Sequence, residues 1–190
     1  MNQNLKAEIR KKIRKLRETI EIEEWQEKSL KIQKKFLSSY YYKNSKIIFT
    51  YFHFDREVKT DLIIKKGIED KKTICLPFIN WKNKVLIPSE IKSIEEIKEE
   101  KGIPVPKFLR PVEIENIDII IVPGVVFDIY KNRIGMGGGF YDRFLKNIPK
   151  KILKIALAFE FQVLNEKLPV NENDIKVDII ITERKIINSF

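Results

Sequence analysis

Residues 118–145 read DIIIVPGVVFDIYKNRIGMGGGFYDRFL, and the architecture of the chain can be built outward from this stretch. After Asp118, residues 119–122 are apolar and β-branched, so residues 118–122 are typical of a strand buried on both faces. Residues 141–146 predict a short helix. A strand, a loop and a helix in this order are the repeating unit of an α/β fold.

The same alternation continues on both sides of this unit. Strands are predicted at residues 47–52, 73–77, 85–87, 118–122, 152–159 and 178–182, and helices at residues 5–20, 25–36, 60–68, 91–101 and 141–146. Prolines keep residues 102–111 extended, and Pro77 is expected to stop its strand. The pattern predicts a single α/β domain over residues 1–190, with three layers and a mostly parallel sheet flanked by helices in a Rossmann-like arrangement.

Composition bounds the class of protein. With one cysteine and one histidine among 190 residues, the chain cannot form an internal disulfide or a zinc site. No apolar run approaches the length of a membrane span, and the first residues lack the apolar core of a signal peptide. We therefore expect a soluble, cytoplasmic protein, monomeric and without a membrane partner.

The net charge of +10 leaves several partners open. A basic chain can bind nucleic acid, but it can also hold an anionic small molecule or simply be well solvated. Twenty-nine of the 37 basic residues are lysine, whereas bidentate recognition of bases and phosphates favours arginine. The balance argues against a nucleic-acid partner.

The N-terminal helix is expected to be amphipathic. Its apolar stripe consists of Leu5, Ile9, Ile13, Leu16 and Ile20. A basic stripe along the edge of the apolar one consists of Lys6, Arg10, Arg14 and Arg17. We expect Arg14 and Arg17 to lie on a solvated face.

The glycine loop is the strongest local signal for chemistry. Four of the seven glycines fall within residues 135–139, between a strand and a helix, where bare main-chain N–H groups can cradle a phosphate. Arg133 can add a charged contact, and Asp142 can hold a magnesium ion. The loop matches neither the Walker pattern nor the dinucleotide-binding pattern.

Residues 123–145 resemble the signature of the 5-formyltetrahydrofolate cyclo-ligase (methenyltetrahydrofolate synthetase) family. That signature is Pro-Gly-x-Ala-Phe-Asp, followed by Arg-Leu-Gly-x-Gly-x-Gly-Tyr-Tyr-Asp-Arg. Residues 6–10, 57–60 and 174–182 also resemble family segments, in the family's order. Mild departures are Val126 for the usual Ala and Phe140 for the first Tyr, whereas Lys59 replaces a usual acidic residue.

The resemblance implies a ligase of folate and one-carbon metabolism that uses ATP and Mg²⁺. Such an enzyme converts 5-formyltetrahydrofolate to 5,10-methenyltetrahydrofolate through a phosphorylated formyl intermediate and releases ADP and phosphate. Phosphoryl transfer of this kind depends on positioning and charge stabilisation rather than on a nucleophilic side chain.

The resemblance also implies roles for individual residues. The catalytic group is Arg133, Gly137 and Tyr141. ATP is bound by Lys6, Arg10, Arg133, Gly135, Gly137, Gly138 and Gly139. The folate is bound by Phe52, Glu57, Met136, Gly137, Gly138, Gly139 and Phe140. The metal ligands are Asp142 and Asp178.

Two other functions stay open at this point. One is a basic nucleic-acid-binding module that uses the N-terminal helix. The other is an anion-binding α/β enzyme without an ATP requirement, because one fold can host many chemistries.

Overall fold

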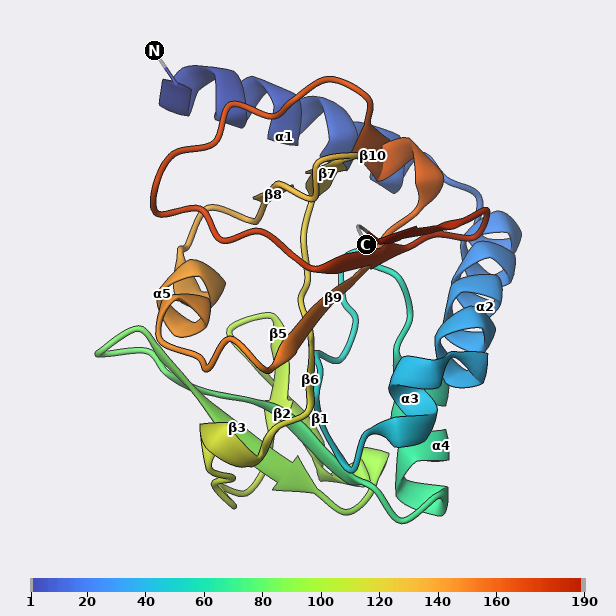
Figure 1. Ribbon diagram of the computed structural model, residues 1–190, viewed down its shortest axis with the longest axis vertical. Helices are drawn as coiled ribbons and strands as arrows, with labels where there is room; N and C mark the ends of the chain where they lie inside the picture. The colour runs from blue at the N-terminus through green and yellow to red at the C-terminus, as the bar shows by residue number, and fades with distance from the viewer. Residues whose placement is uncertain (1, 189–190) are drawn as a thin grey trace.

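Figure 1 shows the computed structural model of the chain, which describes residues 2–188. The helices of this range are α1 (Asn2–Glu18), α2 (Ile22–Ser38), α3 (Tyr40–Asn44), α4 (Asp61–Glu69) and α5 (Phe140–Lys146). The strands are β1 (Ile47–Phe49), β2 (Thr73–Asn80), β3 (Val85–Ile91), β4 (Ile97–Glu100), β5 (Ile103–Pro106), β6 (Ile119–Ile121), β7 (Val126–Asp128), β8 (Arg133–Ile134), β9 (Leu153–Leu157), β10 (Val163–Leu164), β11 (Ile179–Ile181) and β12 (Ile186–Asn188). The domain predicted over residues 1–190 extends beyond the described range at both ends and stays a prediction.

A seven-stranded sheet forms the centre of the molecule, in the order β12-β11-β9-β6-β1-β2-β3. The four inner pairings, β11 with β9, β9 with β6, β6 with β1 and β1 with β2, are parallel. The two edge strands, β3 and β12, are antiparallel to their neighbours. The predicted mostly parallel sheet is thus confirmed.

Both faces of this sheet are buried under helices. In β6, Ile119 and Ile121 contact the cluster that contains Phe36 of α2 and Ile63 of α4, whereas Ile120 contacts the opposite cluster, which contains Phe144 of α5. The alternation follows from the period of two in a strand. Figure 1 shows α2, α3 and α4 on one side of the sheet and α5 on the other, which confirms the expected α/β architecture.

Helix α1 lies apart from these layers, beside the small sheet β10-β7-β8 (Figure 1). Its Ile13 is buried in a separate apolar cluster with Val126 of β7 and Ile134 of β8. This contact places the N-terminal helix next to the glycine loop, which directly follows β8. Among residues 2–188 no helix is long and apolar enough to cross a membrane.

The helix predicted over residues 91–101 is wrong. After a single 3₁₀ turn at Ile94–Glu96, the chain forms the antiparallel hairpin β4–β5. Its two-residue turn, Lys101 and Gly102, has φ angles of 53° and 76°, and two left-handed residues suit the twist of a tight hairpin. The apolar spacing of Ile94 and Ile97 fits a helix equally well, so the turn residues were the better signal.

The strand that was expected to stop at Pro77 continues to Asn80. Pro77 lies opposite Pro88 of β3, and β1 ends at Phe49, which pairs with Cys75. Neither neighbour therefore requires an N–H from Pro77, which a proline could not supply.

Asp128 is a fully buried carboxylate that ties the small sheet to the loop before β11. It accepts hydrogen bonds from the Asn132 backbone N–H (2.8 Å), from Asn132 Nδ2 (2.7 Å) and from the Leu168 backbone N–H (2.8 Å). This role is structural, and it holds the segment that leads into β8 and the glycine loop.

We predict that Asp128→Ala lowers the free energy of unfolding by about 3 kcal/mol or more, because it leaves three buried donors without an acceptor. Urea denaturation measures the change. Asp118→Ala is the matched control, since exposed Asp118 accepts from two backbone N–H groups (2.7 and 2.9 Å) that water can satisfy after substitution. An equal loss in both variants would contradict the role of burial.

Candidate active site

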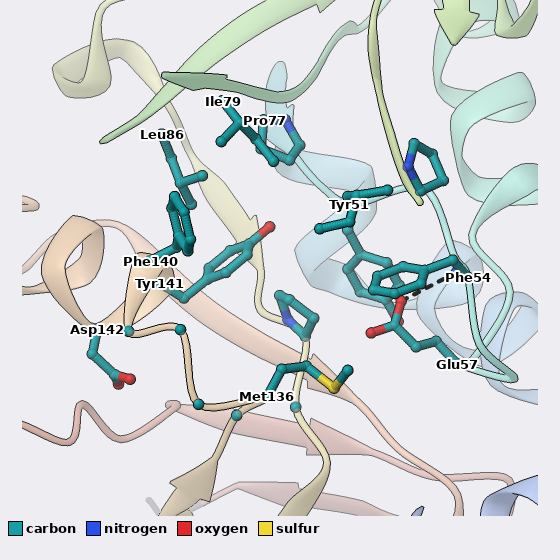
Figure 2. Close-up of a pocket in the computed structure, with 18 of the residues that line it drawn as sticks. Tyr51, Phe54, Glu57, Pro77, Ile79, Leu86, Met136, Phe140, Tyr141 and Asp142 are labelled. Carbon is teal, nitrogen blue, oxygen red and sulfur yellow. Dashed lines mark hydrogen bonds between the residues drawn. The ribbon is translucent and has the colours of Figure 1, made fainter. Parts of the chain in front are cut away.

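Two cavities of opposite character meet at the glycine loop. The first, of about 230 Å³, is mostly apolar and is walled by side chains from the segment after β1, from β2 and β3, and from α5 (Figure 2). The second, of about 330 Å³, is polar and lies between α1, the loop and the segment before β11. Gly135, Gly137 and Gly139 line both.

The residues expected to bind the folate all line the apolar cavity: Phe52, Glu57, Met136, Gly137, Gly138, Gly139 and Phe140. The sequence analysis missed further walls, which come from Tyr51, Phe54, Trp81, Ile103 and Pro104. The last two belong to β5, which the sequence analysis expected to be extended; the hairpin that brings it to the cavity was not expected, because its partner strand β4 lies in the predicted helix 91–101.

The polar cavity gathers part of the expected ATP-binding group. Lys6 and Arg10 project from α1 and line it together with Gly135, Gly137 and Gly139. Gly138 and Arg133 line the apolar cavity instead. The loop therefore divides the expected nucleotide-binding residues between its two sides.

The glycine loop keeps its shape through backbone conformations that favour glycine. Gly137 has a φ of 104° and Gly139 a φ of 67°, and a side chain at either position would be strained. Two arginines bind the loop's carbonyls: Arg10 Nε donates to Gly135 O (2.8 Å), and Arg143 Nη2 donates to Gly138 O (2.9 Å). The loop is thus held from α1 on one side and from α5 on the other.

Arg133 and Asp142 form a buried ion pair at the junction of the cavities. Arg133 Nη2 lies 2.5 Å from Asp142 Oδ1, and Arg133 Nη1 donates to Pro123 O (3.2 Å). The Arg133 side chain is 2% exposed and its Nε is buried without a partner. Asp142 lines both cavities, so this pair stands where ligands of the two cavities would meet.

The structure does not bring the two expected metal ligands, Asp142 and Asp178, into one cavity. Asp178 lines neither cavity; its Oδ2 accepts from the Lys154 backbone N–H (2.8 Å) and pairs with Lys154 Nζ (2.7 Å), which ties the start of β11 to β9. The carboxylate that shares the polar cavity with Asp142 is Asp174, which forms an ion pair with Lys6. Both aspartates lie in the same family-like closing segment, so the sequence alone did not separate them.

Glu57 is the acidic group of the apolar cavity. It is 6% exposed, and its Oε2 accepts from the Phe54 backbone N–H (3.3 Å; Figure 2). Burial raises the pKa of its carboxyl to about 7, although the positive charge of Arg17 opposes the shift. Tyr141 points into the same cavity; its buried hydroxyl has no partner, and burial raises its pKa.

The buried face of α1 combines Lys6 and Arg17 of the basic stripe with Ile13 of the apolar one. Its buried residues are Lys6, Ile13 and Arg17, with Arg10 half-buried, whereas Leu5 and Leu16 are each 47% exposed. The expectation of a solvated Arg17 is wrong. The helix is turned so that its cations face the glycine loop and the segment after β1.

Comparison with known proteins bears on this arrangement. Residues 2–183 match the model of the 5-formyltetrahydrofolate cyclo-ligase family. The chain belongs to this family. A 5-formyltetrahydrofolate cyclo-ligase of Haemophilus influenzae is 30% identical over 95% of this chain and 100% of the relative. A 5-formyltetrahydrofolate cyclo-ligase of Mus musculus is 31% identical over 94% of this chain and 92% of the relative. The resemblance and the enzyme class expected from the sequence are thereby confirmed.

Solved structures of the cyclo-ligase family share the fold. The Aquifex aeolicus 5,10-methenyltetrahydrofolate synthetase has a TM-score of 0.86 and 32% identity, and the match covers 97% of this chain and 92% of the other. A Mycoplasma pneumoniae 5,10-methenyltetrahydrofolate synthetase has a TM-score of 0.75 at 23% identity, which shows the common fold alone.

We predict that Glu57→Gln stabilises the folded protein at pH 8 by up to about 3 kcal/mol. Because the folded-state pKa of Glu57 is raised to about 7, the folded protein binds more protons than the unfolded chain between about pH 4.5 and 7. The wild type therefore loses stability as pH rises through this window, whereas the neutral amide does not. The gain should disappear below about pH 4.5. Urea denaturation at pH 8 tests the gain in stability, and the same measurement at pH 4 tests its disappearance. A gain that is equal at the two pH values would contradict the titration argument.

Proposed function

We propose that this chain converts 5-formyltetrahydrofolate to 5,10-methenyltetrahydrofolate, with ATP as co-substrate and Mg²⁺ as cofactor. The observation that carries the proposal is that the glycine loop forms a common wall of the two cavities. One side of it is a largely apolar cavity with a single buried glutamate, and the other is a polar cavity lined by two cations and two carboxylates. A folate and a nucleotide bound on the two sides would meet at Gly137.

The apolar cavity suits the pterin end of a folate. Flat aromatic rings can stack against the side chains of Phe52 and Phe140. A pterin presents adjacent N–H donors, and an ionised Glu57 can accept two of them as a bidentate pair. Glu57 is the group that would set the orientation of the ring.

The polar cavity suits a polyphosphate. Lys6 and Arg10 supply charge from α1, and the main chain around Gly137 allows close approach because it carries no side chain. We assign ATP binding to these groups together with Arg133, Gly135, Gly138 and Gly139. The partners implied are small molecules, and the monomeric state, the cytoplasmic location and the lack of a nucleic-acid partner stay predictions.

Asp142 and Asp174 fit a magnesium ion because carboxylate oxygens are the ligands that hard cations prefer. Each is already paired with a cation, Arg133 or Lys6, and these cations can transfer to phosphate oxygens as the carboxylates transfer to the metal. Bound there, the ion would neutralise part of the phosphate charge.

The chemistry needs positioning more than it needs a nucleophile. The formyl oxygen attacks the γ-phosphorus and ADP leaves. N10 then attacks the formyl carbon and gives up its proton, and phosphate departs with this proton and the former formyl oxygen as the five-membered ring closes. Arg133 stabilises the charge on the transferred phosphoryl group, and Gly137 allows the two reactants to approach. The partnerless Tyr141 hydroxyl is placed to hydrogen-bond the reacting end of the folate.

We predict that the purified protein with Mg²⁺, ATP and 5-formyltetrahydrofolate develops the near-ultraviolet absorbance of the methenyl product, and that omission of ATP prevents it. Product formed without ATP would support an ATP-independent enzyme instead. No product, combined with salt-sensitive binding of RNA or DNA, would favour the nucleic-acid-binding module.

We further predict that Asp174→Asn raises the Mg²⁺ concentration needed for half-maximal turnover at least tenfold, because the variant removes one charged ligand. The half-saturating folate concentration should change less than threefold. Asp178→Asn is the matched control: an amide oxygen can still accept from the Lys154 backbone N–H, so the magnesium dependence should stay within twofold of wild type. The opposite ranking of the two variants would restore Asp178 as the ligand.

A further inference from the structure

Arg17 is the most deeply buried charge on α1. Its side chain is 1% exposed, less than those of the proposed phosphate ligands on the same helix. A buried guanidinium is costly unless its charge and its hydrogen bonds are compensated, and two of its nitrogens, Nε and Nη1, have no hydrogen-bond partner. The proposed phosphate contacts leave this residue unexplained.

Arg17 forms an ion pair with a residue of the turn that precedes Glu57. Arg17 Nη2 donates to Asp55 Oδ2 at 2.9 Å. Arg14 binds the same oxygen at 3.2 Å, but its side chain is 39% exposed. Two cations of one helix thus share one carboxylate, and only one of them is removed from water.

The turn that Asp55 occupies is conformationally demanding. Asp55 and Arg56 have φ angles of 48° and 55°, so two consecutive non-glycine residues are left-handed. The Glu57 backbone N–H closes the turn on Phe54 O (3.0 Å), and Trp25 Nε1 donates to Glu57 O (2.8 Å). The ion pair with Arg17 fixes the tip of this turn, and Glu57 follows it directly into the cavity wall.

Arg17 also acts on the glutamate through its charge. The charged and titratable groups that influence Glu57 from the surrounding elements are Arg17 of α1, Asp55 of the same turn, Tyr51 after β1 and Tyr141 of α5. Arg17 is the one cation in this group, and it opposes the rise in the pKa of Glu57 that burial causes. Asp55 acts in the same direction as burial.

We propose that Arg17 is a positioning residue for the folate: its buried guanidinium fixes the 54–57 turn through Asp55 and keeps Glu57 a carboxylate in the cavity wall. The inference rests on the proposed function, because it assigns Glu57 to the pterin. It adds that recognition of the folate depends on a residue of the nucleotide-side helix that contacts neither ligand.

The test is to measure the binding of 5-formyltetrahydrofolate by calorimetry, without ATP, at several pH values between 5 and 9. Wild-type affinity should fall as pH drops through about 7, as Glu57 takes up a proton and loses an acceptor. In Arg17→Met the midpoint should move up by about one pH unit, which lowers the affinity at pH 7 about fivefold because a smaller fraction of Glu57 is ionised.

Three further variants separate this role from simple stabilisation. Arg14→Met is the matched control, since it removes a cation from the same Asp55 oxygen at a partly exposed site, and the midpoint should stay within about 0.3 pH units of wild type. Arg17→Lys keeps the charge, so its midpoint should lie close to the wild-type value. In a Glu57→Gln background, Arg17→Met should cause no further loss of affinity.

Each result bears on the inference. An unmoved midpoint in Arg17→Met, or an equal loss in the Glu57→Gln background, would overturn it while leaving the proposed function intact. If Arg17→Met fails to fold, Arg17→Gln and Arg17→Lys decide instead: the glutamine should move the midpoint and the lysine should not, and equal midpoints would overturn the role of charge. A wild type that binds no 5-formyltetrahydrofolate at any pH would overturn both the proposed function and this inference.

Discussion

The main chain of the glycine loop separates a largely apolar cavity from a polar one, and the rest of the site depends on this partition. Gly137 and Gly139 adopt left-handed conformations, and Arg10 and Arg143 bind loop carbonyls from two different helices. A side chain on the loop would enter one cavity or the other. Apart from Met136, residues 135–139 are glycines, so the wall between the two cavities consists mostly of backbone, and the two ligands proposed for them could approach each other closely across it.

Charge around this wall is compensated before any ligand arrives. Arg133 is paired with Asp142 and Lys6 with Asp174, so two of the three cations proposed for phosphate binding already have a carboxylate partner, whereas Arg10 binds the Gly135 carbonyl. Such pairs avoid the cost of uncompensated buried charge. Glu57 differs, because it forms no ion pair within residues 2–188 and the charge of Arg17 opposes the rise in its pKa from a distance. The group proposed to bind the pterin is thus one whose pKa is raised by its surroundings.

The sequence predicted the features that follow from periodicity. It did not predict features that depend on contacts between segments far apart in the chain. The isoleucine run of β6 identified a buried strand because both faces of a parallel sheet are apolar. The glycine loop and its flanking residues were also found, because their spacing is local. Arg17 was misplaced because the orientation of α1 is set by its contacts with the small sheet and the Asp55 turn, which no helical period reveals. Asp178 is expected from the resemblance to be a metal ligand, but only the folded chain shows that Asp174, and not Asp178, lines the polar cavity.

The ion pair between Lys6 and Asp174 joins residues that are 168 positions apart, and it closes one wall of the polar cavity. During synthesis on the ribosome, Lys6 therefore emerges long before Asp174 is available to pair with it. Contacts of such long range also form slowly in refolding, because the intervening loop must be closed first. The polar cavity gains this wall only after residue 174 has been made, and until then the site proposed for the nucleotide is incomplete.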